Sequence, residues 1–393
     1  MARFPARNAL AVATMLFAAT ACGDAEHERD ITPMGRSASA IFGSSAPSTA
    51  MEDFVVRLIP GCSGVLVAPT IVLTARHCVT SDLIEIGEFT CTLGTEPTPP
   101  QQLKVFIGSE VTTGRLVPVK RILIDFDSTN CRDDVAAVEL AEPVMNVATP
   151  ALLLDALPDV GSQGTIIGWG ATDDSGATQP VSRLKGTGAI VGVGAGTFAT
   201  QGSSRFLDDG YVVMSGVSVC RGDSGGAMLD AKGALIGTIF GNLQAQATTK
   251  RSCADAVSLA IPHSKHVAFI ERVFQSTGKM PVRAGKPPPA DLGGPCTQNN
   301  ECNSNYCVGV GARSICSKLC SPTVDCGGGL VCTSTGKGQS VCLDVTSPPG
   351  NESACAASAG HRGWQGWPSV LAAALALFAW RRRRSAHGER SSR

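Results

Sequence analysis

The stretch Gly222-Asp223-Ser224-Gly225-Gly226 surrounds one serine hydroxyl with small residues. A serine hydroxyl is a poor nucleophile until a neighbouring imidazole takes its proton, and that imidazole needs a carboxylate on its other nitrogen to fix its tautomer. The chain offers both groups earlier, in Thr74-Ala75-Arg76-His77-Cys78 and Asp134-Val135-Ala136-Ala137-Val138-Glu139-Leu140. We therefore predict that Ser224 is a nucleophile, that His77 is its base and that Asp134 orients the base.

Asp133 is the alternative to Asp134, because both acids precede the same apolar run. Asp134 opens the run and would stand at the start of a strand whose other residues are anchored in the core. Asp133 has the character of a solvated turn residue. The small residues around Ser224 also let backbone N–H groups come close to a developing oxyanion, which acyl transfer requires.

These three stretches, in the order His, Asp, Ser, resemble the chymotrypsin/trypsin family of serine endopeptidases. The resemblance covers residues 41–277 and includes Cys62-Ser63-Gly64 and the turn Gly168-Trp169-Gly170. It implies two antiparallel β-barrels with the site in the cleft between them. It also implies that the N–H groups of Gly222 and Ser224 form the oxyanion hole. The disulfides implied by the resemblance are Cys62–Cys78 and Cys220–Cys253.

The resemblance places Ser218 at the base of the specificity pocket. A serine there would leave a buried Lys or Arg side chain of a substrate without a charge partner, so we expect cleavage after apolar or small residues. In the family, the acid before the nucleophile pairs with a new N-terminal ammonium after a pro-segment is removed. That acid is Asp223 here, and the matching N-terminus is Ile41, after cleavage of the Ala40–Ile41 bond.

Composition supports an all-β body. The chain has 393 residues, more than one compact domain usually holds, and its 44 glycines and 5% aromatic residues favour short strands and turns. Short apolar runs recur between turn residues. One segment after Pro262 instead places Val267, Ile270, Val273 and Phe274 at helical spacing, with Gly278 closing it. The formal net charge of zero gives no reason to expect a nucleic-acid partner.

The 16 cysteines divide into an even group of six in the body, an even group of eight from Cys296 to Cys342, and the single residues Cys22 and Cys355. Even groups indicate disulfides and an oxidising compartment. Zinc binding is the alternative for the eight, but that stretch contains no His and no CxxC pair. So small a unit would depend on disulfides for its stability. Residues 296–343 resemble Cys-rich repeats of bacterial surface proteins and loosely the Dickkopf pattern, and no pairing is assigned.

The N-terminal region carries an export signal. Residues 1–22 combine Arg3 and Arg7 with an apolar core and small residues before Cys22. The run before Cys22 resembles a lipoprotein lipobox, so both lipidation of Cys22 and plain signal cleavage are open. Residues 23–40 are polar and form a pro-segment or tether.

The C-terminal region carries a membrane segment. Residues 278–295 form a Pro/Gly linker, residues 296–343 the Cys-rich module, and residues 344–362 a second linker. Residues 363–380 are apolar with Trp near both ends, and 381–393 begin with four Arg, a pattern typical of a transmembrane segment with a basic cytoplasmic tail. Cys355, the apolar segment and the Arg cluster together resemble the MYXO-CTERM sorting signal.

The sequence therefore predicts a secreted, surface-held serine endopeptidase acting on proteins or peptides through an acyl-enzyme on Ser224. We expect attachment to the outer membrane or cell surface through lipid or the C-terminal segment. The chemistry needs neither cofactor nor metal. The alternative is a catalytically silent, protease-like surface protein with a binding or adhesion role.

Overall fold

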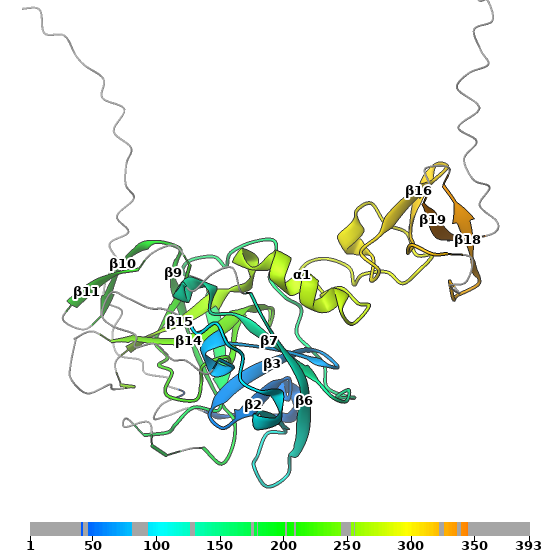
Figure 1. Cartoon of the computed structure of the whole chain (residues 1–393). Coiled ribbons are helices and arrows are strands. Elements are labelled where there is room, and N and C mark those ends of the chain that lie inside the picture. The colour runs from blue at the N-terminus through cyan, green and yellow to red at the C-terminus, as the bar shows by residue number, and fades with distance from the viewer. Residues whose placement is uncertain are drawn as a thin grey trace, which may run out of the picture. The chain divides into compact units, whose positions relative to one another are not determined.

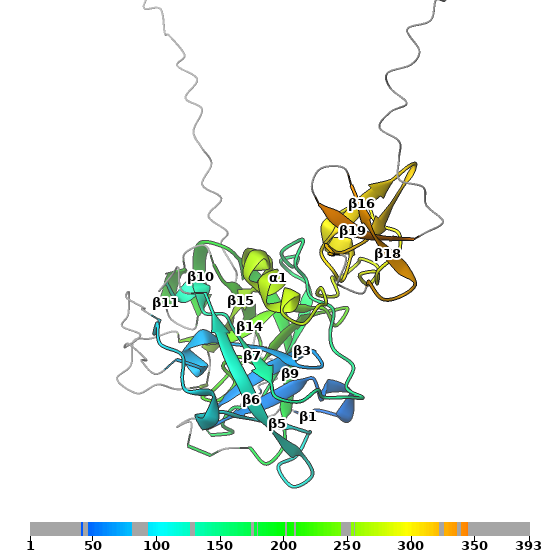
Figure 2. The same ribbon diagram turned by 45° about the vertical axis from the view of Figure 1, so that its right-hand side comes forward.

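Short apolar runs form antiparallel strands that close into two barrels (Figures 1 and 2). The all-β class, the two barrels and the C-terminal helix are confirmed. This computed structural model describes residues 41, 46–80, 93–125, 130–173, 177–178, 180–200, 203–207, 210–244, 253–254, 256–321, 326–335 and 339–344. The predicted signal and pro-segment, with Cys22, and the predicted membrane segment and tail, with Cys355, lie outside these residues.

The first barrel closes in the strand order β2-β3-β4-β7-β6-β5. Its interior is filled by aliphatic side chains such as Val55, Leu66 and Leu73, which are fully buried. Every residue of β4 and β7 is buried, because one face of each strand lines the barrel and the other is covered. The strands are β2 (Val55–Ile59), β3 (Cys62–Ala68), β4 (Ile71–Thr74), β5 (Lys104–Ile107), β6 (Arg115–Ile124) and β7 (Ala136–Leu140).

The second barrel closes in the order β9-β12-β15-β14-β13-β8, with β8 pairing back to β9 and β1 added to β9. Contacts of β2 with β8 and of β4 with β14 dock the two barrels against each other. The strands are β1 (Ala46–Pro47), β8 (Gln163–Gly168), β9 (Leu184–Val193), β12 (Val212–Ser215), β13 (Ala227–Asp230), β14 (Leu235–Gln244) and β15 (Ala256–Pro262), with the separate hairpin β10 (Gly196–Thr200) and β11 (Ser203–Leu207).

The glycine-rich residues 186–193 lie within strand β9. This strand pairs with β8 on one side and β12 on the other. Glycine is required there for close packing, since a Cβ on Gly188 would lie 2.2 Å from the carbonyl oxygen of Ser215. Glycine in this strand therefore allows the neighbouring backbone to come close.

A single α-helix follows the last barrel strand, as the spacing predicted. The 3-10 turn η5 (His263–Lys265) leads into α1 (Val267–Gln275), which buries Ile270, Val273 and Phe274 against the body. Gly278 ends the segment at a φ of 69°, which a residue with a Cβ rarely adopts. Further 3-10 turns are η1 (Ala50–Glu52), η2 (Arg76–Cys78), η3 (Pro100–Gln102), η4 (Cys131–Asp133) and η6 (Asn299–Glu301).

Arg183, just before β9, is fully buried and ties the segment after β1 to the first barrel. Its guanidinium donates to Ser48 Oγ at 2.6 Å, to the carbonyl oxygens of Val55 and Gly108 at 2.9 and 3.0 Å, and to Thr49 O at 2.7 Å. It also pairs with Asp53 at 3.0 Å. Burial lowers the pKa of Arg183 and the Asp53 charge opposes this, so each partner replaces hydration that the cation has lost.

The chain divides into two compact units: Met1–Val308 with Ile315–Lys318, and Gly309–Ser314 with Leu319–Arg393. In the first unit, the segment predicted as a Pro/Gly linker is held to the barrels. Residues 282–284 exchange backbone hydrogen bonds with Leu152 at 2.8 Å, and Arg283 forms ion pairs with Asp155 and Glu271.

Disulfides connect the Cys-rich residues within each unit, as the even cysteine count predicted. The first unit contains Cys296–Cys307 and Cys302–Cys316, and the second contains Cys320–Cys332 and Cys326–Cys342. The strands are β16 (Cys307–Val310), β17 (Arg313–Cys316), β18 (Leu330–Ser334) and β19 (Ser340–Asp344). Among the described residues, no helix has the length and apolar character needed to cross a bilayer.

We expect the Arg183→Met substitution to lower the free energy of unfolding by about 3–5 kcal/mol, because Asp53 and several buried carbonyl groups lose their partner. The matched control is Arg115→Met. Arg115 pairs with Glu142 where both side chains are about half exposed, so its loss costs at most about 1 kcal/mol. Equal denaturation midpoints for the two variants would show that Arg183 does not tie the segment to the barrel.

Candidate active site

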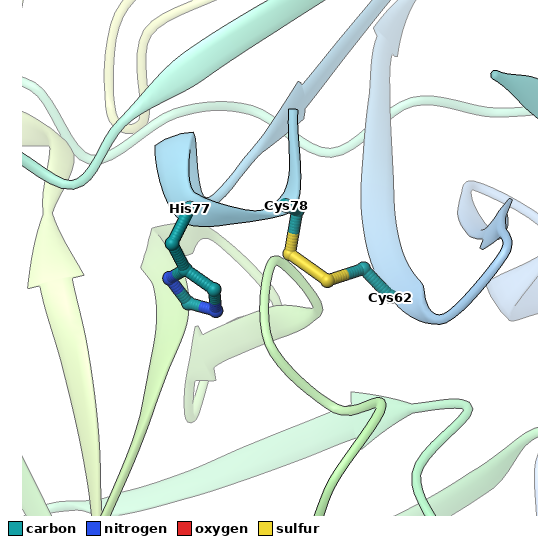
Figure 3. A group of neighbouring side chains, drawn as sticks. All are labelled: Cys62, His77 and Cys78. Atoms are coloured by element: carbon teal, nitrogen blue, oxygen red, sulfur yellow. A yellow bond between two sulfur atoms is a disulfide. The ribbon is translucent and has the colours of Figure 1, made fainter. Parts of the chain in front are cut away.

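His77 stands on η2, directly after β4 of the first barrel. The next residue, Cys78, is bonded to Cys62 of β3 with a Cα–Cα distance of 6.0 Å. Figure 3 shows His77 and Cys78 on the same turn, with the Cys78 sulfur joined to Cys62. The disulfide that the resemblance implied is therefore present, and it anchors the turn that carries the imidazole.

Asp134 lies at the end of η4, just before β7, and its carboxylate is fully buried. One oxygen accepts from the backbone N–H of His77 at 2.8 Å, and the other lies 2.6 Å from His77 Nδ1. Asp134, rather than Asp133, makes both contacts. The bidentate arrangement fixes the imidazole and directs Nε2 away from the carboxylate.

The pKa of His77 reflects two opposing effects. Burial disfavours the imidazolium and lowers the pKa, whereas the charge and hydrogen bond of Asp134 raise it, and the net result is a pKa above 6.5. The His77 imidazole is thus a stronger base than an isolated histidine. If it accepts a proton, the neighbouring Asp134 carboxylate stabilises the imidazolium that forms.

Ser224 lies on the loop between β12 and β13 of the second barrel. Gly222 and Gly225, which flank it, have φ values of 103° and 81°, a region that favours glycine. A Cβ on Gly225 would lie 2.1 Å from Thr74 Oγ1. Among the described residues, no acceptor is bound to the N–H groups of Gly222 and Ser224. These two donors are therefore available on the loop that carries the hydroxyl.

The hydroxyl of Ser224 donates to the carbonyl oxygen of Phe240 at 3.3 Å. Within the described residues it has no hydrogen bond to His77. The two are neighbours through other contacts: Cys78 Sγ lies 3.6 Å from the Ser224 carbonyl oxygen, and the Phe240 ring packs on the imidazole. The Ser224 hydroxyl is thus engaged with Phe240 in this structure, and catalytic hydrogen bonds often form only once a substrate is bound.

Ser63 of β3 was not singled out by its sequence, yet it links the two halves of the site. It is fully buried. Its N–H donates to Ser224 O at 2.8 Å, its hydroxyl donates to Gly222 O at 2.8 Å, and the same hydroxyl accepts from the Trp169 N–H at 2.9 Å. One residue of the first barrel therefore contacts both Gly222 and Ser224 on the loop between β12 and β13.

Asp223, directly before Ser224, is completely buried. Its carboxylate accepts from the N–H groups of Gly170 at 2.7 Å and Cys220 at 2.8 Å. A Cβ on Gly168 or Gly170 would lie within 2.2 Å of its oxygens, which explains both glycines of the Gly-Trp-Gly turn. Burial raises the pKa of Asp223 to about 7, and the two backbone hydrogen bonds only partly oppose this.

The side chain of Ile41 is fully buried and belongs to the same apolar cluster as Val217 and Val219, on the segment that leads to Asp223. Ser218, between those two valines, is also buried, and its hydroxyl donates to the carbonyl oxygen of Cys253. Cys253 is bonded to Cys220, so the second implied disulfide is present. On the neighbouring strand β14, the amide of Asn242 donates to Val219 O at 2.8 Å.

Three groups of described residues have the composition of a metal site. One contains Cys62, His77 and Cys78, and the other two contain only cysteines of the Cys-rich region. Every cysteine in these groups is in a disulfide. None of the three therefore offers the thiolate that a metal requires.

Comparison with known proteins gives consistent matches. The family model Trypsin matches residues 41–267. The chain is 32% identical over 204 residues to serine protease 56 of Mus musculus, covering 48% of this chain and 31% of that protein. It is 32% identical over 238 residues to trypsin of Phaedon cochleariae, and this match covers 57% of this chain and 82% of that protein. The chain thus spans about a third of the length of the mouse relative.

Among solved structures, the chain is similar to neuropsin, a serine protease expressed in the limbic system of mouse brain. The TM-score is 0.45 and the sequence identity is 17%. The match covers 58% of this chain and 98% of the neuropsin chain.

The Ser63→Ala substitution should leave the buried N–H of Trp169 without an acceptor and lower the free energy of unfolding by about 1–3 kcal/mol. It should also reduce kcat in a peptidase assay, because the nucleophile loop loses a tie to the first barrel. Thr238→Val is the control: Thr238 Oγ1 is buried with no partner among the described residues, so removing it should leave stability unchanged or higher. A Ser63→Ala protein as stable and active as Thr238→Val would contradict this role.

Proposed function

Because this chain belongs to the trypsin family of serine proteases, we propose that it is a serine endopeptidase with Ser224 as nucleophile, His77 as general base and Asp134 as the residue that orients the base. One observation carries the proposal. The buried Asp134 carboxylate holds both the backbone and the Nδ1 of His77, beside a serine whose loop is anchored to the same barrel.

In this mechanism, Ser224 Oγ attacks the scissile carbonyl carbon while His77 Nε2 takes its proton. The N–H groups of Gly222 and Ser224 stabilise the oxyanion of the tetrahedral intermediate. Collapse of the intermediate expels the amine, which receives the proton from His77, and leaves an acyl-enzyme. Water, deprotonated by His77, then attacks the ester carbonyl carbon; Ser224 Oγ leaves and receives that proton from His77, and the carboxylic acid product is released. Asp134 stays ionised throughout and stabilises the imidazolium.

The specificity pocket favours small or apolar substrate side chains. Its base residue, Ser218, offers no charge, and its hydroxyl is already engaged with Cys253 O. The Asn242 amide, engaged with Val219 O, adds no charge either. A buried Lys or Arg side chain would therefore pay its desolvation cost without an ionic partner.

The enzyme is a zymogen activated by cleavage between Ala40 and Ile41. Asp223 is buried, and among the described residues its carboxylate accepts hydrogen bonds from two backbone N–H groups, so ionising it is unfavourable. A new ammonium group on Ile41, whose side chain is already buried in the second barrel, would neutralise that carboxylate. Ala40 lies outside the described residues, and Ile41 is the first residue after the cleaved bond.

The protein acts outside the cytoplasm on protein or peptide substrates. Six disulfides join described cysteines, which favours an oxidising compartment. Export through residues 1–22 and surface attachment through lipid on Cys22 or the C-terminal segment are part of the same proposal. A silent, protease-like adhesion protein is the competing function, and the active-site geometry favours the enzyme.

A fluorophosphonate probe tests the proposed activity. The protein beginning at Ile41 should be labelled on Ser224 and should cleave a peptide library after small or apolar residues. Ser224→Ala should abolish labelling and lower kcat by about a millionfold. No labelling would support the silent protein, and cleavage only after Lys or Arg would refute the pocket assignment.

The rate of peptide hydrolysis should fall in acid with a midpoint above pH 6.5, because His77 must be neutral to accept the proton and its pKa is raised.

Activation has its own test in the pH dependence of stability. In the uncleaved chain the pKa of Asp223 is raised from 3.8 to about 7. Between these two pH values the folded state therefore binds more protons than the unfolded state. Its stability should therefore fall by several kcal/mol as the pH rises through this range. Cleavage before Ile41, or Asp223→Asn in the uncleaved chain, should remove this fall. An active enzyme with a different N-terminus would contradict the scheme.

A further inference from the structure

Strand β14 contains a bulge at Phe240, next to the proposed nucleophile. Ile239 pairs with Ala260 and Gly241 pairs with Leu259, which leaves Phe240 as an extra residue with no partner on β15. A bulge bends a strand and re-aims the side chain at its extra residue, and bulges are frequent beside active sites. Phe240 is only partly buried, while Ile239 before it is fully buried.

The bulge gives Phe240 two contacts with the site. Its carbonyl oxygen accepts the hydrogen bond from Ser224 Oγ at 3.3 Å. Its ring meets the His77 imidazole edge to face, with the ring centroids 6.1 Å apart and the planes at 88°. A single residue thus contacts both the proposed nucleophile and the proposed base.

Tyr211 supports the ring from a second direction. It is buried immediately before β12, and its ring centroid lies 5.4 Å from that of Phe240. The Phe240 ring therefore contacts two other rings, the imidazole of His77 and the phenol ring of Tyr211. Aromatic pairs contribute to stability beyond the area they bury, so both contacts favour the observed orientation of the Phe240 ring.

We propose that Phe240 is a positioning residue that excludes water from the His77–Asp134 pair and fixes the plane of the imidazole, while its carbonyl group holds the Ser224 hydroxyl. This inference rests on the proposed function. The Asp134 carboxylate is fully buried, and both of its hydrogen bonds within the described residues are with His77. Excluding water lowers the local dielectric and strengthens that pair.

The variants are Phe240→Ala, which removes the cover, and Phe240→Leu, which keeps much of its apolar volume. The control is Phe106→Leu. Phe106 makes a similar edge-to-face contact with Trp169, at 5.6 Å and 89°, in the first barrel and without touching His77. Peptide hydrolysis by the form beginning at Ile41 gives kcat and KM. Independently of activity, proton NMR in a Ser224→Ala background follows the deshielded Nδ1 proton shared by His77 and Asp134.

Phe240→Ala should lower kcat by about ten- to a hundredfold with little change in KM, because a misplaced base slows the chemical step. Phe240→Leu should lie between Phe240→Ala and the parent, and Phe106→Leu should match the parent. The Nδ1 proton should be sharp in the parent and in Phe106→Leu, and broadened by exchange with water in Phe240→Ala.

A sharp Nδ1 proton in Phe240→Ala overturns the inference whatever the rates are, and so does exchange broadening already present in the parent. Unchanged kcat in Phe240→Ala, measured against an active parent, also overturns it. A parent that neither hydrolyses peptides nor reacts with a fluorophosphonate refutes the proposed function instead, and the NMR comparison still decides whether Phe240 shields the pair.

Discussion

The contact of Ser63 with the loop around Ser224 is the interaction on which the site depends. His77 and Asp134 come from the first barrel and Ser224 from the second, so their separation is set by how the barrels dock. Ser63 binds Ser224 and Gly222 through backbone and hydroxyl together. Because β3 pairs with β4, which leads to His77, this docking also fixes the distance between His77 and Ser224.

Buried charged groups also stabilise the observed packing of the two barrels. Asp134 is held by His77, and Asp223 by two backbone N–H groups. Arg183 gathers carbonyl oxygens from the segment after β1 and from the first barrel. A buried charge without these partners would be costly, so each one penalises alternative packings. The segment that Arg183 holds follows Ile41, which connects the packing of the barrels to the proposed activation.

Much of the site could be predicted because its residues carry their chemistry in short motifs. His77, Asp134 and Ser224 stand in local contexts that a catalytic role requires, and the glycines around Ser224 are explained by positive φ values and close approach. The helix over 267–275 followed from apolar spacing. Ser63 and Phe240 were missed. Ser63 is an ordinary serine until a second barrel is packed against it, and Phe240 is an ordinary apolar strand residue until the bulge turns it.

The sequence by itself determined the all-β class, the helix and the residue types available for catalysis, because hydrophobic period, glycine and motif spacing act over a few residues. Only the tertiary structure decided the direction of the Ser224 hydroxyl, the partners of the buried charges and the contact of Phe240 with His77. These depend on strands separated by many residues in the chain, whose register and bulges are set by packing across the whole barrel and leave no local signal.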